Sequence, residues 1–566
     1  MARPLPSGVF PRGLWLLGLG AACGSPPPPG VPAPCPASPA LAAPSAPPVP
    51  AAAPARPALS LAVELPDDPA APPRLAVTLD GPAADLAILV ADEPPAAIAI
   101  TDADGPVPAT IDGKRVLLGR RAAPPIRAVY TLGTIAGGPR RALFSGARVL
   151  APAAWDSVPI AWETATPKDP ELHVASTLGA TPPIVAPRER LARSTWLAGP
   201  GGVARFRAAE GHDDAAWVGY TAFEPRTIAA EIAVLRSSLG EVFGATDDRT
   251  STTLFFVEPR ERGDFLALRR AGGVVVRAGG GEPWGAPMRL AVAHELVHAY
   301  IGETVWLGPP GDARMRWFHE GVTRWVARER LLSAGLLDHA EYTHEVNGAF
   351  AALAASPLRA QPNDALARAA RGGLLVQVAR GATYAARVDA LVRDKSQGKR
   401  HLGHLLRPLI EDAVRRRGEL PPGAFEDLVA KELGEPERLV LRDAVDRGLL
   451  PPLPPRAFGP CFRLETAQWA IYDLGFDEDA TRVAEDHHPA GFAREGPAAR
   501  AGLRKDDAVV SVRSTWGNPD KDAVVTLRRG GDERAITFRP TSGRAPGFAL
   551  RFVPGADKSC AALARR

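Results

Sequence analysis

The stretch "RLAVAHELVHAY" (residues 289–300) places two histidines and a glutamate in an otherwise apolar segment. Its apolar residues leave no solvated face, which predicts a buried helix over residues 289–301. On a helix, His294 and His298 lie on one face, so both imidazoles can reach one metal ion, and Glu295 projects beside them. Buried polar groups without partners are costly, and a zinc ion with its water would offset that cost. The alternative interpretation is a structural histidine pair on a half-exposed helix face.

A catalytic zinc site needs a third protein ligand and one open position. The downstream stretch "RWFHEGVTRWVA" supplies Glu320 on the next predicted helix, after the turn-rich "GPPGDA". The neighbouring His319 would point about 100° away on that helix, so it is not included among the ligands.

The segment "AHELVH" followed by "WFHEGVTRWVARERLLSAGL" resembles the glycyl aminopeptidase family of zinc metallopeptidases, which are gluzincins. The resemblance extends over residues ~60 to ~555. It implies Zn²⁺ as cofactor, the ligands His294, His298 and Glu320, and Glu295 as general base. The expected reaction is hydrolysis of peptide bonds by a zinc-activated water.

Two positions depart from the family pattern. A tyrosine that donates to the tetrahedral oxyanion is usual three residues before the glycine matched by Gly381, and this chain has Val378 there. Loss of one such donor costs about 10²–10³ in rate. Tyr384 is a candidate substitute, with a core aromatic as the alternative. Upstream, Val274 and Val275 stand where the substrate-lining strand carries acidic and histidine side chains, so specificity is expected to differ from that of an aminopeptidase and to include endopeptidase action.

The pattern along the chain predicts an α+β multidomain protein. Short β-type runs and turn signals indicate an N-terminal β-sandwich-like domain, whereas helical periodicity indicates a mainly helical region, which the resemblance implies is a thermolysin-like catalytic domain. "TIAAEIAVLRSSLGEVFG" predicts an amphipathic helix and "STTLFFVEP" a buried strand. The predicted segments are a signal peptide (1–22), a Pro/Ala-rich tether (23–58), the β domain (59–210), the gluzincin domain (211–455) and a PDZ domain (456–566).

The first residues combine Arg3 and Arg12 with a short apolar run and small residues before Cys23. This pattern is typical of a signal peptide, and the small residues before the cysteine resemble a bacterial lipobox. We therefore expect an exported protein of the bacterial cell envelope, lipid-anchored through Cys23. The alternative is plain secretion with Cys23 removed or unmodified.

The C-terminal stretch "GPAARAGLRKDDAVVSV" resembles a PDZ domain of the protease-associated type. The resemblance implies that "DLGFD", with Leu474, Gly475 and Phe476, is a loop that captures a peptide C-terminus. The alternative is a small β domain without a ligand. Cys461 and Cys560 bracket this region and are the expected disulfide in an oxidising compartment, with two free thiols as the alternative.

Composition narrows the partners. At 566 residues the formal net charge is only +4, and basic residues are interleaved with acids, which argues against nucleic-acid binding. The expected partners are a peptide or protein substrate, a peptide C-terminus at the PDZ domain, and a membrane through the lipid anchor only. The leading hypothesis is a zinc peptidase. The second hypothesis is a zinc- and peptide-binding lipoprotein with weak or no hydrolysis.

Overall fold

The computed structural model describes residues 59–553 except for 69–70, 81–82, 88–95, 114, 133–139, 153–154, 165–168, 209–210, 220, 245–249 and 417–418. The predicted signal peptide and tether, with Cys23, lie outside the described residues, and so does Cys560. In the part of the chain that is described, none of the helices combines the length and apolar character that a membrane crossing requires.

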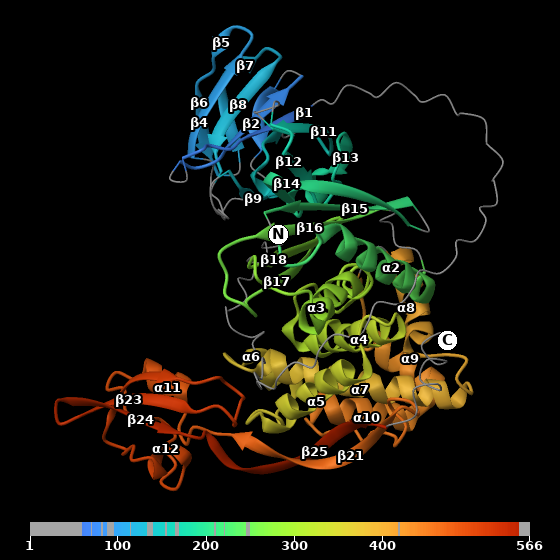
Figure 1. The fold of residues 1–566 in the computed structure, drawn as a ribbon, viewed down its shortest axis with the longest axis vertical. Coiled ribbons are helices and arrows are strands. Elements are labelled where there is room, and N and C mark those ends of the chain that lie inside the picture. Colours follow the sequence, from blue (N-terminus) through green and yellow to red (C-terminus); the bar gives the residue numbers. More distant parts are fainter. Residues whose placement is uncertain are drawn as a thin grey trace, which may run out of the picture.

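Two β-sheets enclose an apolar core in the N-terminal part, at the top of Figure 1. Their strand orders are β13-β11-β1-β2-β8-β4-β5 and β10-β3-β7-β6. In β1, Leu59, Leu61 and Val63 are buried and alternate with half-buried residues, as expected when one strand face lies on a core. The strands are β1 (Leu59–Glu64), β2 (Arg74–Leu79), β3 (Ala83–Ala87), β4 (Ala96–Asp102), β5 (Gly105–Pro106), β6 (Ala109–Asp112), β7 (Arg115–Ala122), β8 (Ile126–Thr131), β10 (Ala151–Pro152), β11 (Ser157–Thr164) and β13 (Ile184–Pro187), with the short helices η1 (Gly146–Arg148) and α1 (Arg188–Ala192) between them.

A third sheet, with the order β12-β14-β15-β16-β18-β17, crosses the middle of the molecule (Figure 1). Both faces of its centre are covered. Phe255, Val274 and Val276 belong to the core shared with the helices, whereas Leu254 and Val275 belong to a separate core on the other face. The strands are β9 (Ala142–Ser145), which pairs with β14, β12 (Leu172–Ser176), β14 (Thr195–Ala208), β15 (Gly211–Val218), β16 (Thr250–Val257), β17 (Leu266–Arg270) and β18 (Gly273–Ala278).

The predicted domain boundary between residues 210 and 211 falls within a β-sheet. Strands β14 and β15 form one antiparallel hairpin that pairs Ala208 with Gly211 and Gly201 with Val218. The hairpin belongs to a sheet that extends from β12 to β17, so the chain does not divide there. The change from β-type to helical periodicity near this position marks the entry into the helical part and not the edge of a sheet.

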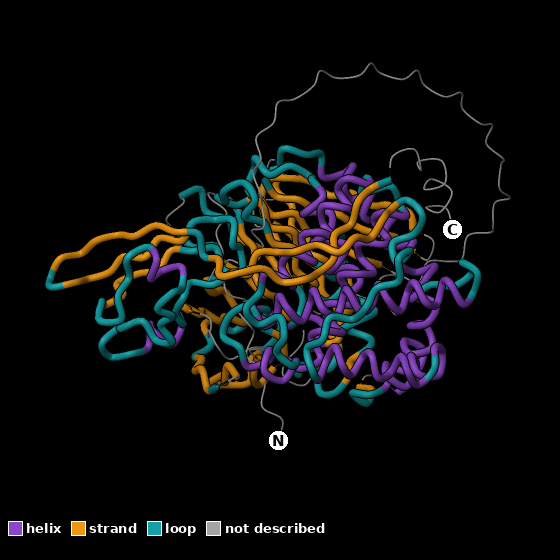
Figure 2. The backbone as a smooth tube through the Cα atoms, turned by 90° about the horizontal axis from the view of Figure 1, so that it is seen from below, coloured by secondary structure: helices purple, strands orange, loops and turns teal. Residues whose placement is uncertain are grey.

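The helical part covers one face of the third sheet, and Figure 2 shows most of the helices gathered on the right of the view. Helix α2 (Pro225–Phe243) confirms the predicted amphipathic helix, with Glu224 as N-cap and Ile228, Ile232 and Leu235 buried. The buried strand predicted from "STTLFFVEP" is β16. The remaining elements are α3 (Ala286–Val297), β19 (Trp306–Leu307), η2 (Ala313–Met315), the π-helical turn η3 (Trp317–Val322), α4 (Thr323–Ser333), α5 (His339–Ala355), α6 (Asn363–Arg368), α7 (Gly373–Lys395), α8 (Leu402–Arg416), β20 (Glu419–Leu420), α9 (Ala424–Leu433) and α10 (Glu435–Asp446).

The C-terminal part is joined to the helices by a long two-stranded ribbon of β21 (Phe462–Tyr472) and β25 (Thr541–Phe552), which packs on α5. Asn347 of α5 accepts from and donates to the main chain of Leu550, at 2.7 and 2.9 Å. Arg371, between α6 and α7, also forms ion pairs with Glu478 (2.7 Å) and Asp479 (3.1 Å) of the C-terminal part. The ribbon leads to α11 (Glu478–Val483), α12 (Pro497–Arg500), β22 (Ala508–Arg513), β23 (Ala523–Arg529) and β24 (Asp532–Phe538), which project to the side of the molecule (Figure 1).

The predicted peptide-binding loop, residues 473–477, lies between β21 and α11. Leu474 and Phe476 are buried in the core of the C-terminal part, and the N–H of Gly475 donates to Asp473 (2.6 Å). The loop is followed by α11, and the described residues 477–496 form no strand beyond one isolated bridge. Cys461 is buried and disulfide-bonded, as predicted. Its pairing with Cys560 stays a prediction.

Candidate metal centre

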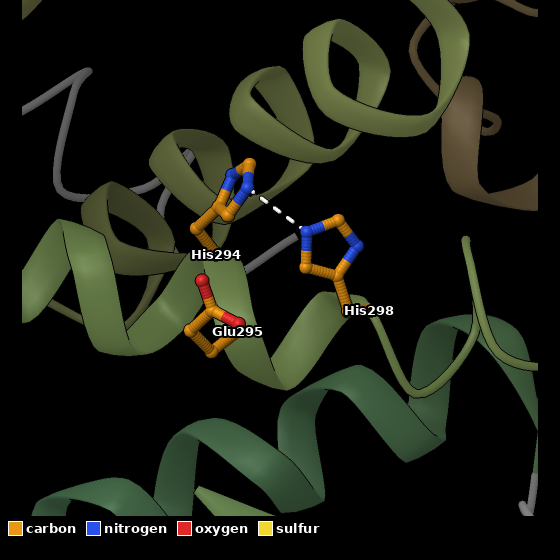
Figure 3. A group of neighbouring side chains, drawn as sticks. All are labelled: His294, Glu295 and His298. Carbon is orange, nitrogen blue, oxygen red and sulfur yellow. Dashed lines mark hydrogen bonds between the residues drawn. The ribbon is translucent and has the colours of Figure 1, made fainter. Parts of the chain in front are cut away.

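Helix α3 brings the two histidines of the candidate site together. It begins after Gly285, has a proline in its first turn, and ends at Val297, earlier than the predicted end at residue 301. His298 is the C-cap, but its backbone is still right-handed helical, so its ring stays on the same face as the ring of His294. Figure 3 shows the two rings turned toward one another, and their Nε2 atoms are 3.0 Å apart.

Glu320 is brought to this histidine pair by the π-helical turn η3. Its Oε2 atom lies 3.0 Å from Nε2 of His294 and 3.5 Å from Nε2 of His298. A π-helical turn inserts an extra residue into a helix and is frequent at functional sites. The turn is held against α7 by a close backbone approach between Gly321 and Gly381, where no side chain fits. Glycine at position 381 is therefore needed for the packing of η3 on α7.

The three facing atoms fit a zinc ion. Zinc bonds of about 2.0–2.1 Å to nitrogen and oxygen in a tetrahedral arrangement place ligand atoms about 3.3 Å apart. The separations of 3.0, 3.0 and 3.5 Å are close to this value. The Nδ1 atom of His298 contacts the carbonyl of Ile301 (2.9 Å), which fixes the tautomer that leaves Nε2 free to bind a metal. The Nδ1 atom of His294 has no such partner among the described residues, so packing sets its orientation.

The ionisation of the three facing side chains also favours a cation between them. Burial lowers the pKa of His294, and the nearby His298 lowers it further. Burial opposes a charge on His298, but the Glu320 carboxylate raises the pKa of this histidine to about 9. Burial would raise the pKa of Glu320, yet the two imidazoles hold it well below its usual range. The centre therefore presents a neutral imidazole, an ionised carboxylate and a second imidazole that retains a proton until a metal replaces it.

Two carboxylates compete for the position of third ligand. Glu295, His294 and His298 offer ligand atoms that all lie within 4.8 Å of one another. The Glu295 carboxylate, however, accepts the backbone N–H of Arg269 at 2.6 Å, whereas Glu320 contacts both imidazoles directly. Glu320 is therefore the carboxylate that faces both imidazoles, and Glu295 lies beside them with a backbone N–H as its partner.

His319 is excluded as a ligand by its contacts. Its Nε2 atom accepts the N–H of Leu307 (3.0 Å), and the ring is buried against Trp306. Burial lowers the pKa of His319 to about 4, so the ring is neutral at physiological pH. The residue fastens η3 to β19, which agrees with its exclusion from the sequence-based ligand set.

The proposed substitute for the missing oxyanion donor is not supported. Tyr384 is buried, and its hydroxyl lies 3.4 Å from the carbonyl of Glu437 on α10. Burial raises the pKa of this phenol above its normal range. Tyr384 is thus a core aromatic between α7 and α10, the alternative interpretation of this residue.

The hydroxyl of Tyr300 lies against Gly240 of α2. Val378 is half-buried on α7, with its carbonyl beside Gly321.

The strand expected to line the substrate cleft, which carries Val274 and Val275, is not the strand at the edge of the sheet. Val274 and Val275 lie in β18, and both are fully buried in the cores on either side of the sheet. The strand at the edge, and the one whose backbone reaches Glu295, is β17. It carries Arg269 and Arg270, which sequence reasoning missed. The only signal for them was their place in "DFLALRRAGG", directly before the tight turn that joins the two strands.

No protein-family model matches the chain, and no curated protein matches it. Among solved structures, the chain is similar to an aminopeptidase N family protein from Idiomarina loihiensis, with a TM-score of 0.60 and 12% identity over 89% of this chain and 100% of that one. An M1 zinc metallopeptidase from Deinococcus radiodurans matches over 70% of this chain and 94% of that one, with 18% identity and a TM-score of 0.43. The first of these likenesses shows that the chain has the α+β multidomain fold of an aminopeptidase N family protein.

Proposed function

We propose that this protein is a zinc-dependent peptidase with His294, His298 and Glu320 as metal ligands and Glu295 as general base. The observation that carries the proposal is the convergence of three ligand atoms at 3.0, 3.0 and 3.5 Å, with a second carboxylate beside them that does not join the ligand set. A zinc ion held there would polarise the scissile carbonyl and acidify a water molecule.

The chain's own residues supply the remaining functions. The Glu295 carboxylate can take a proton from water and deliver it to the leaving amine. The N–H of Arg269 holds this carboxylate in place at 2.6 Å. In an antiparallel strand the N–H and C=O of one residue point to the same side, and every second residue repeats that direction. The main chain of Ala267, two residues before Arg269, therefore faces the same outer edge of β17 and can pair with an extended peptide.

The test compares the zinc-loaded wild type with Glu295→Gln on a mixture of peptides. We expect the substitution to lower peptide hydrolysis by at least about 10²-fold while one zinc per chain is retained, since general base catalysis contributes about 10²–10⁴-fold. Glu261→Gln is the matched control, because Glu261 is exposed on the loop before β17. Equal turnover by the wild type and Glu295→Gln would refute the peptidase assignment.

A second candidate function is a zinc- and peptide-binding protein with weak or no hydrolysis. The observation that favours it is Val378 at the expected oxyanion donor, together with the engagement of Tyr384 elsewhere. The same experiment separates the two, because this candidate binds zinc and peptide without turnover that depends on Glu295. For either candidate we propose export to the bacterial cell envelope with a lipid anchor at Cys23, which mass spectrometry of the mature N-terminus tests.

A further inference from the structure

The strand beside the candidate metal centre carries an arginine that the proposed function does not use. Arg270 ends β17, and its guanidinium is half-buried. Its Nη1 donates to the carbonyl of Arg269 (2.9 Å), and among the residues that the structure describes it forms no ion pair. A half-buried guanidinium without a carboxylate partner is unusual, since burial of a charge is costly unless a partner offsets it.

The backbone of β17 determines where this guanidinium lies. The N–H of Arg269 points away from β18 and donates to Glu295. In an antiparallel strand the C=O of the same residue points to the same side, so the carbonyl of Arg269 also faces the outer edge of β17. Because Arg270 donates to that carbonyl, its guanidinium lies at the edge where Glu295 lies. The electrostatic influence of Glu295 on Arg270 agrees with this placement.

The neighbouring acids are already engaged. Glu303 pairs with Arg269 at 2.9 Å and with Arg193 at 3.6 Å. On the same face of the strand pair as Arg270, Glu258 binds both Arg277, at 2.6 Å, and Arg260. Each of these carboxylates serves two arginines, so neither neutralises a further cation.

The surroundings of Arg270 therefore carry an excess of positive charge. Burial and the nearby Arg193 and Arg277 lower the pKa of the Arg270 guanidinium, whereas Glu295 acts in the opposite direction. A zinc ion at the metal centre would add to this positive field. An anionic group on the substrate would be favoured beside Glu295.

We propose that Arg270 determines specificity by binding a carboxylate of the substrate next to the scissile bond. The inference rests on the proposed peptidase function and adds the chemical class of substrate. The carboxylate has two sources, which are the C-terminus of a peptide and an acidic side chain within it. A planar guanidinium binds either one through two parallel hydrogen bonds.

The experiment uses the zinc-loaded full chain and two matched pairs of peptides. One pair differs by a C-terminal carboxylate or carboxamide, and the other by aspartate or asparagine beside the cleaved bond. The expected wild-type preference in kcat/KM for the carboxylate member of at least one pair is about tenfold or more, as for a charge-assisted bidentate contact. The pair that shows the preference identifies the source of the carboxylate.

Arg270→Gln is expected to reduce that preference to less than about twofold, mainly through KM, and Arg270→Lys to retain part of it. Arg226→Gln, the same charge change on the exposed surface of α2, is the matched control. An Arg270→Gln variant that loses kcat equally on all four peptides, as an oxyanion-stabilising group would, overturns the proposal. So does an unchanged preference.

A binding measurement separates this inference from the proposed function. Calorimetry with zinc-loaded Glu295→Gln tests recognition without turnover. Tighter binding of the carboxylate member, lost in Glu295→Gln/Arg270→Gln, supports the inference even if the wild type hydrolyses no peptide. Equal binding of both members, or no binding of either, overturns it even if hydrolysis is established.

Discussion

Substitution of Gly381 by alanine tests how the helical part positions the proposed metal ligand Glu320. A Cβ atom on Gly381 would lie 1.8 Å from the carbonyl oxygen of Trp317 and 3.0 Å from Cα of Gly321. Contacts under 3.0 Å are essentially never seen for Cβ atoms, so α7 and η3 must separate by about 1.2 Å. Trp317 and Glu320 belong to the same π-helical turn, so this movement is transmitted to the ligand.

The expected loss follows from the tolerance of zinc sites. Metal–ligand distances tolerate about 0.2 Å, far less than the movement that Gly381→Ala requires. We expect zinc affinity to fall by at least about tenfold and kcat/KM by about 10²-fold, as for other misplacements of about 1 Å. Overpacking should also lower the free energy of unfolding by about 1–3 kcal/mol. Zinc content, chelator competition and denaturant unfolding measure these effects.

Two further variants make the result interpretable. In Gly321→Ala, the new Cβ atom would lie 2.7 Å from Cα of Gly381, its nearest neighbour. The two elements need to separate by only about 0.3 Å, so the effect should be smaller. Gly348→Ala in α5 meets nothing within 4 Å and should be neutral or stabilising by about 0.4–1 kcal/mol. A folded Gly381→Ala protein with wild-type zinc affinity and kcat/KM would show that this contact does not position Glu320.

Three other measurements test separate parts of the structure. Glu320→Gln should weaken zinc binding by more than about 100-fold, because even outer-shell partners are worth 10–100-fold; unchanged zinc affinity would remove Glu320 from the ligand set. Burial and nearby cations lower the pKa of His401 to about 3 in the folded protein, so its neutral form contributes stability above its unfolded pKa of 6.5. This stability is lost as pH falls from 6.5 toward 3, by up to about 1.4 kcal/mol per pH unit, and His401→Gln should flatten the fall in denaturant titrations. Gly372 has φ +70 and a Cβ there would lie 1.7 Å from Trp516, so Gly372→Ala should loosen the C-terminal part and speed its proteolysis, whereas Gly398→Ala, at φ +80 with open space, should not.

The sequence was sufficient for features that depend on local periodicity. The i and i+4 spacing of His294 and His298 places both rings on one helix face in any helical backbone, and this holds although α3 ends one residue before His298. Helix α2 and strand β16 were predictable for the same reason, because their burial patterns repeat within a few residues. Glu320 was found through its motif, and its distance to the imidazoles then came from the packing of η3 on α7.

Only the tertiary structure decided features that depend on which strand has a neighbour. A run such as "LALRRAGGVVVRA" predicts two strands and a turn, but it does not say which strand is at the sheet edge. Pairing with β16 buries Val274 and Val275 and leaves Arg270 at the edge beside Glu295. Likewise, "DLGFD" does not specify the element that follows it, and the structure shows that this element is the short helix α11. The physical reason is that sheet order and register are set by contacts between distant segments, whereas helical faces are set within one turn.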